Sequence, residues 1–142
     1  MSDVLLRGAP FAIGEAVVES LRSGFSAQEV RVLDNPVRAA DLSDGQRIVF
    51  YEDQPDRAIE KNRRVFSFAV GVINRTAEAR LGAHTDYRRA KRLVRDAIKG
   101  IAEVVQPGTP VREGEVIFRL ENIDVGGSLV LGTFTVDYRD PD

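Results

Sequence analysis

The feature that most constrains the fold of this chain is the residue alternation in segment 65–74, VFSFAVGVIN. Successive side chains of a β-strand point to opposite faces, so residues two apart share a face. The segment therefore predicts a strand with one large apolar face and one face of small residues. The large face carries Phe66, Phe68, Val70 and Val72, and the small face carries Ser67, Ala69 and Gly71.

Four further segments are expected to be strands because they are rich in β-branched and aromatic residues. They are 29–34 (EVRVLD), 47–52 (RIVFYE), 115–123 (EVIFRLENI) and 128–139 (SLVLGTFTVDYR). The last two are joined through Gly126 and Gly127. A Gly-Gly pair between two β-rich runs is typical of a hairpin.

Two polar segments lie between the early strands and are expected to be loops. Segment 35–45 is rich in Pro, Asp and Gly, which favour turns. Segment 53–64 is long for a tight hairpin, so we expect it to project from the sheet. Its polar composition further predicts that it is mobile in the free subunit and becomes ordered at an interface.

Two segments have the apolar spacing of amphipathic helices. The first follows Pro10 and ends near Gly24. The second covers about 86–105, with Thr85 placed to act as its N-cap. On a helical wheel of about 100° per residue, the second helix carries its apolar side chains on one side. The other side carries Arg88, Arg89, Lys91, Arg92, Arg95 and Lys99.

The order of these elements, α-β-β-β-α-β-β, predicts an α+β fold. We expect an antiparallel or mixed sheet of about five strands with both helices packed on it. The chain has 142 residues, which favours a single domain spanning 1–142 with a loose C-terminal end at 140–142. The predicted core face of the sheet carries Phe66, Phe68, Val70, Phe118, Phe134 and Val136.

The bulk composition excludes some kinds of chemistry and reveals an uneven charge distribution. The sequence has no cysteine, so it forms no disulfide and no thiolate site. It shows no signal peptide and no membrane-spanning run, and we expect a cytoplasmic protein with no membrane partner. The net charge is −2, but residues 57–99 carry +8 and the remainder −10. Such a molecule can attract copies of itself head to tail or bind an anionic partner locally.

The basic face of the second helix has three possible interpretations. It can be an ordinary solvated face, a surface that meets an acidic protein, or a nucleic-acid-binding face. Only Asp86 and Asp96 interrupt its positive charge, which is unusual for a solvated helix. Single-stranded nucleic-acid sites add stacking aromatics, and the helix has only Tyr87, on its apolar side. A protein partner is therefore favoured over nucleic acid.

No catalytic constellation stands out, and we expect no enzyme activity. The only histidine, His84, lacks the spacing of a metal site. The carboxylates of segment 52–56 lack the Glu-x-Lys spacing of a nuclease, although they are the best candidate for an overlooked active site. The sequence has no phosphate-binding GxxxxGK[ST] loop and no Ser-His-Asp pattern with a nucleophile elbow.

Several segments together resemble a known family. The first helix has Pro10, Ile13, Ala16, Val17 and Leu21 at characteristic positions, and RRVFSFAVGVINR, DAIKGIAEV and GTFTVDYRDP follow in order. Through these segments and the order of its elements, the chain from Phe11 to Arg139 resembles the tail-terminator family of long-tailed bacteriophages, the minor tail protein U type. A related tail-completion or head–tail joining protein is an alternative within the same class.

The resemblance implies a virion protein of the phage tail, present in the host cytoplasm during assembly. It implies a ring, usually a hexamer, that caps the tail tube and offers a surface to the head-connector protein. DNA passes through such a ring, and neither enzyme activity nor a cofactor is implied. For the candidate protein interface we select the basic residues of the middle region: Lys61, Arg63, Arg64, Arg88, Arg92, Arg95 and Lys99. The alternative function is a nucleic-acid-binding module using the helix at 86–105.

Overall fold

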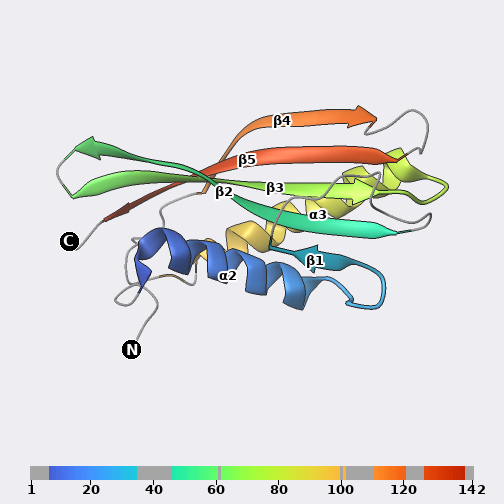
Figure 1. Cartoon of the computed structure of the whole chain (residues 1–142), viewed down its shortest axis with the longest axis horizontal. Helices are drawn as coiled ribbons and strands as arrows, with labels where there is room; N and C mark the ends of the chain where they lie inside the picture. The colour runs from blue at the N-terminus through green and yellow to red at the C-terminus, as the bar shows by residue number, and fades with distance from the viewer. Residues whose placement is uncertain are drawn as a thin grey trace.

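The computed structural model describes residues 7–34, 46–60, 62–99, 101, 111–120 and 127–139. These residues form one five-stranded sheet and two helices (Figure 1). In chain order the elements are α2 (Ala9–Gly24), β1 (Arg31–Leu33), β2 (Arg47–Glu60), β3 (Arg63–Asn74), α3 (Ala79–Lys99), β4 (Arg112–Leu120) and β5 (Ser128–Arg139). The predicted α+β fold and the order α-β-β-β-α-β-β are confirmed.

The sheet is mixed and has the strand order β1-β2-β3-β5-β4. The short strand β1 runs parallel to β2, and the other three pairings are antiparallel. The predicted C-terminal hairpin is present, because β4 pairs directly with β5. The central strand β3 is paired along its full length with β5, from Arg63–Arg139 to Asn74–Ser128.

The main core lies between one face of the sheet and the two helices. Phe66, Phe68, Val70, Phe134 and Val136 are all buried there, as predicted. The ring of Phe68 stacks on that of Phe134, with centroids 5.6 Å apart. The opposite face of the sheet is also apolar, with a smaller buried cluster of Ile48, Phe50, Ile73 and Leu129.

The sixth predicted core residue, Phe118, is not buried: 56% of it is exposed. It shares the helix-covered face with its pairing partner Val130, but it lies on β4 at the edge of the sheet. The aromatic ring stacks on His84 of α3, with centroids 4.9 Å apart. Period-two alternation identifies the face a side chain points to, but it does not reveal that a strand lies at the edge.

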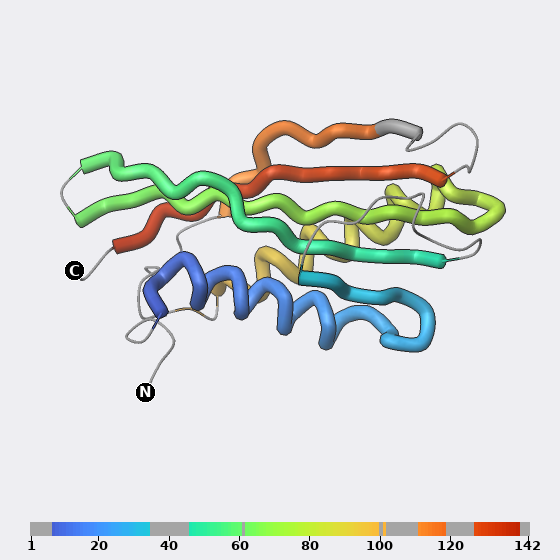
Figure 2. The backbone as a smooth tube through the Cα atoms, viewed as in Figure 1, coloured from blue at the N-terminus to red at the C-terminus, as the bar shows by residue number. Residues whose placement is uncertain are grey.

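The prediction of a loop at 53–64 is wrong for most of these residues. β2 continues to Glu60 and β3 begins at Arg63, so these residues form an antiparallel ribbon. Asn62 turns the chain with a φ of 65°. Pro55 lies where the register shifts between Asp53 and Asp56, and a bulge tolerates a residue that has no N–H to donate. The ribbon does project: in Figure 2 its tip extends past both helices.

The predicted start of the second helix is also wrong. Helix α3 begins at Ala79, and Thr85 lies within it, donating its Oγ1 hydrogen bond to the carbonyl of Leu81 at 2.8 Å. Thr85 is therefore not an N-cap. At the helix start, Gly82 packs against the buried side chain of Asn74, and a Cβ there would collide with it. Of the predicted extension to residue 105, only Ile101 lies within the described residues.

Three other sequence predictions fall on residues outside the described ranges. They are the loop at 35–45, the turn residue Gly126 and the C-terminal end at 140–142.

Candidate protein interface

Helix α3 is fixed on the sheet and against α2, and these contacts decide which of its side chains face outward. Ala83, Ala90, Val94 and Ile98 are buried in the main core. The Oγ of Ser20 in α2 donates a hydrogen bond of 2.8 Å to the carbonyl of Leu93. Gly24, at the end of α2, lies directly against the side chain of Leu93, where a Cβ would not fit.

One charged residue of α3, Asp86, is buried and paired with β2. It is 3% exposed, and its two carboxylate oxygens accept hydrogen bonds from Arg47, at 3.0 Å from Nε and 2.7 Å from Nη2. These bonds raise the pKa of the Arg47 guanidinium above its ordinary value. Glu29 lies 3.7 Å from the same guanidinium. A bidentate pair of this kind holds both position and orientation.

A second polar contact joins α3 to β4 through Glu113. Its carboxylate accepts a hydrogen bond of 2.7 Å from Tyr87 Oη and one of 2.9 Å from Lys91 Nζ. Partial burial acts to raise the pKa of Glu113, but these two hydrogen bonds and the charges of Lys91 and Arg95 outweigh it and lower the pKa. Burial and the bond to Glu113 raise the pKa of Tyr87.

A third contact holds the side of α3 that faces α2. Arg89 Nε donates a 2.7 Å hydrogen bond to the carbonyl of Gly24. Its guanidinium also lies 5.5 Å from the ring centroid of Phe25, within the range of a cation–π interaction. Two of the six basic residues on the predicted face, Lys91 and Arg89, are therefore held by neighbouring elements.

The other four, Arg88, Arg92, Arg95 and Lys99, form what we call the basic stripe. Their spacing of four, three and four residues places them along one line of α3, and all four are exposed. No oppositely charged group within the described residues comes within ion-pair distance of them. The structure thus brings together four of the seven predicted interface residues as an unpaired, outward-facing line of positive charge.

The remaining three predicted residues do not belong to this stripe. Arg63 lies on β3 and pairs with Glu60 at 2.7 Å and with Asp137 at 3.8 Å. Arg64 pairs with Asp56 at 2.8 Å. The side chain of Lys61 lies outside the described residues. Arg63 and Arg64 are therefore engaged within the subunit.

Two carboxylates of the 52–56 segment support the projecting ribbon. Asp56 accepts hydrogen bonds from Arg64 and from Tyr138 Oη, the latter at 2.9 Å from its nearer oxygen, and so ties β2 to β3 and β5. Burial and this contact raise the pKa of Tyr138 to about 12. Asp53 accepts a 2.7 Å hydrogen bond from Tyr51. Asp56 therefore has a role in cross-strand contacts, whereas the contact of Asp53 lies within β2.

The described residues contain no cluster of three or more acidic or histidine side chains able to hold a metal ion. Within the same ranges, neither helix is long and apolar enough to cross a membrane.

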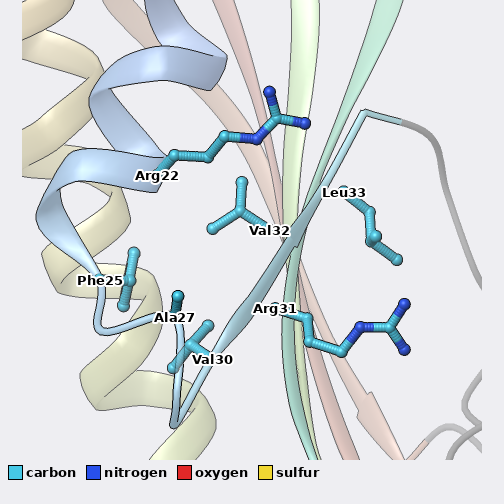
Figure 3. A pocket seen from close by; sticks show the side chains of 7 residues that line it. All are labelled: Arg22, Phe25, Ala27, Val30, Arg31, Val32 and Leu33. Atoms are coloured by element: carbon cyan, nitrogen blue, oxygen red, sulfur yellow. The ribbon is translucent and has the colours of Figure 1, made fainter.

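Sequence reasoning missed a groove at the β1 edge of the sheet. It has a volume of about 340 Å³ and is lined by Arg22, Phe25, Ala27, Val30, Arg31, Val32 and Leu33, which we call the β1 groove. In Figure 3, Val32 points toward α2, whereas Arg31 and Leu33 lie on the other side of the strand. The groove therefore lies beside β1, which is an edge strand of the sheet formed by the described residues. The strand itself was predictable, but its edge position depends on a parallel pairing that local sequence does not encode.

Comparison with known proteins gives no family assignment. No protein-family model matches the chain, and no curated protein matches it. Among solved structures, a crystal structure of a protein from Akkermansia muciniphila aligns with 92% of this chain and 78% of its own, at 12% identity and a TM-score of 0.36. A likeness at that level carries no argument about function.

Proposed function

We propose that this protein is a phage virion component that caps the tail tube and forms the head–tail junction as a ring. The proposal rests on the resemblance of segments between Phe11 and Arg139 to tail-terminator proteins. The expected partners are further copies of the chain, together with the tail tube protein and the head-connector protein. The family resemblance implies that the copies form a hexameric ring. DNA passes through the ring without sequence-specific recognition.

The observation that carries the proposal is the basic stripe. Exposed charges that form no ion pair with any described residue are suited to steer and orient another surface of opposite charge. The stripe lies on the outward side of α3, whereas Asp86, Arg89 and Lys91 on the other sides of this helix have partners. We therefore assign the stripe to contact with an acidic surface on a neighbouring protein of the tail or connector.

The same observation supports a second candidate, a nucleic-acid-binding module. Four cationic side chains along a helix can contact a phosphate backbone, and such binding weakens steeply with salt. Within the described residues of α3 the aromatic side chain, Tyr87, is buried and bonded to Glu113. It is not available to stack on a base, so the protein-contact candidate is preferred.

Charge reversal in the stripe separates the two candidates. The double variant Arg92→Glu with Arg95→Glu should weaken capping of tails, scored by electron microscopy of tails incubated with purified protein. A matched control, Arg57→Glu with Arg80→Glu, reverses two exposed arginines outside the stripe and outside the β1 groove, and it should leave capping unchanged. If the stripe variant caps tails normally but loses salt-sensitive DNA binding, the nucleic-acid candidate replaces the proposal. Genes for tail tube, capsid and tape-measure proteins beside the coding gene would support the tail assignment.

A further inference from the structure

The two most exposed large apolar side chains of the described residues lie beside the start of α3. Leu81 is 62% exposed and Phe118 is 56% exposed. His84 connects them, because it follows Leu81 by three residues on one side of the helix. Its ring stacks on that of Phe118, with centroids 4.9 Å apart. We call Leu81, His84 and Phe118 the anchor patch.

The anchor patch continues directly into the basic stripe. The line begins with Leu81 and His84 and goes on through the four residues of the stripe, at steps of three, four, four, three and four residues. Such steps keep side chains on one side of a helix. At 1.5 Å per residue, the line from Leu81 to Lys99 is about 27 Å long. Arg80 leaves the helix about 100° from Leu81 and lies off this line.

We propose that this surface binds an acidic helix of a neighbouring protein, with an apolar side chain at one end of its row of acids. The apolar side chain covers the anchor patch, and the acids meet the basic stripe. This inference rests on the proposed function, because it names the kind of segment through which the tail or connector protein contacts the stripe.

The charges of α3 select an acidic occupant. The stripe forms no ion pair within the described residues. Asp96, the one exposed acid of this helix, leaves it about 100° from Arg95 and so lies beside the line. A second helix repeats the spacing of three or four residues, so its acids keep step with the stripe. Exposed ion pairs each contribute little, and they therefore orient the partner more than they hold it.

The anchor patch supplies the affinity that the ion pairs lack. Covering Leu81 and Phe118 removes exposed apolar surface from water, and burial of one large apolar side chain strengthens binding by roughly tenfold or more. Leu81 favours a protein over a nucleic acid, because an aliphatic side chain offers no ring on which a base can stack. His84 already occupies one face of the Phe118 ring.

A synthetic probe tests the surface without phage components. The probe is a helical peptide of alanine and glutamine, about 20 residues long. It carries a leucine and a phenylalanine three residues apart, followed by four glutamates at steps of four, four, three and four. A second version has the apolar pair at the other end, because a helix can lie either way along α3.

NMR titration of the isotope-labelled protein measures the binding of each probe. At least one version should shift the backbone amide signals of α3 and β4. Replacing its leucine and phenylalanine with alanine should weaken binding by roughly tenfold. Raising the salt concentration should weaken it further, because the stripe is exposed to solvent.

Matched variants of the protein locate the contact. Leu81→Gln with Phe118→Thr removes both exposed apolar side chains and keeps residues suited to a helix and a strand. It should bind the probe roughly tenfold more weakly and unfold at nearly the natural temperature. Ile59→Thr is the control, because Ile59 is 49% exposed but lies on the projecting ribbon. This control should bind the probe as the natural protein does.

Two results would overturn the inference. The first is that neither probe binds better than its alanine version, or that the change at Leu81 and Phe118 leaves binding unaltered. The second is that an oligothymidine binds more tightly than the probe and depends on the same two side chains. Nucleic acid would then be the occupant of the surface.

The tail assay separates this inference from the proposed function. If Leu81→Gln with Phe118→Thr caps tails normally, whereas Arg92→Glu with Arg95→Glu does not, the tail proposal stands and the role of the anchor patch is overturned. If the probe binds through both the anchor patch and the stripe but the natural protein does not cap tails, the binding surface stands and the tail proposal fails.

Discussion

The inward and outward sides of α3 both carry charged groups, but they differ in what those groups contact. Toward the sheet and α2, Asp86, Lys91 and Arg89 are each held by a neighbouring element at 2.7–2.9 Å. On the outward side, the basic stripe has no acid within ion-pair distance among the described residues. Charges on one helix therefore divide into those that position it in the fold and those available to another molecule.

This difference has a physical basis in solvation. A charge that loses water on folding must be compensated by a partner, or the desolvation penalty destabilises the protein. An exposed charge keeps its hydration and needs no such partner. The comparison predicts a graded series of effects: large for the core beneath α3, intermediate for its paired charges, and small for the basic stripe.

The largest effect is expected beneath the helices. Phe68→Ala should destabilise the protein by about 3–5 kcal/mol, because the ring is fully buried and stacked on Phe134. Phe118→Ala is the matched control, since the same side chain is 56% exposed there, and it should cost much less. Urea unfolding followed by circular dichroism measures both. Equal losses would show that the main core does not lie on the face described.

The next effect separates the paired from the unpaired acids of α3. Asp86→Ala should lower the free energy of unfolding by about 1.5–3 kcal/mol, because it removes two charged hydrogen bonds and leaves Arg47 without its main partner. Asp96→Ala, on the exposed side of the same helix, should change stability little. A similar loss in both variants would mean that helix propensity, and not the contact with β2, governs the result.

Sequence pattern was a good guide where local periodicity and tertiary packing agree. Segment 65–74 alternates large and small side chains along the chain, so β3 was predicted almost to its ends. Helix α2 was likewise predicted nearly to its bounds, since Pro10 and Gly24 mark a helix start and end in the local sequence. Four of the seven candidate interface residues lie together in the structure as the sequence predicted. Helical spacing alone places these four on one line of α3.

Sequence pattern failed where the decisive contact comes from elsewhere in the chain. Residues 53–60 have the composition of a loop, yet they form a strand by pairing with β3, and Asp56 is tied to Arg64 and Tyr138. Thr85 looks like a helix N-cap, but α3 begins at Ala79, and Gly82 in its first turn packs against Asn74, a contact between residues that local sequence does not reveal. The β1 groove depends on which strand lies at the sheet edge, and that follows from long-range pairing alone.

An acid pH experiment examines the contact between α3 and β4. The pKa of Glu113 is lowered in the folded protein below its ordinary value of 4.5. A lowered folded-state pKa contributes stability above the unfolded-state pKa, and this contribution is lost as pH falls through the folded-state value. Glu113→Gln should therefore be less stable than the natural protein near neutral pH, and the difference should shrink below about pH 4.5.

The matched control for that experiment is Glu115→Gln, an exposed carboxylate two residues further along β4. Its stability difference from the natural protein should not follow the same acid dependence. If the two variants behave alike across the pH range, the hydrogen bonds from Tyr87 and Lys91 do not hold Glu113 as described.

The smallest effect on stability is expected in the basic stripe. Arg92 lies three or four residues from Arg88, Arg89 and Arg95, so Arg92→Glu replaces three repulsive pairs with attractive ones, while it turns the attractive pair with Asp96 into a repulsive one. Each exposed pair contributes little and the balance is favourable, so the free energy of unfolding should not fall by more than about 0.5 kcal/mol. Thermal unfolding and tail capping are measured on the same preparation. If the variant keeps its melting temperature but loses capping, the stripe contacts another molecule. A marked loss of stability would instead show that Arg92 has an unrecognised partner within the fold.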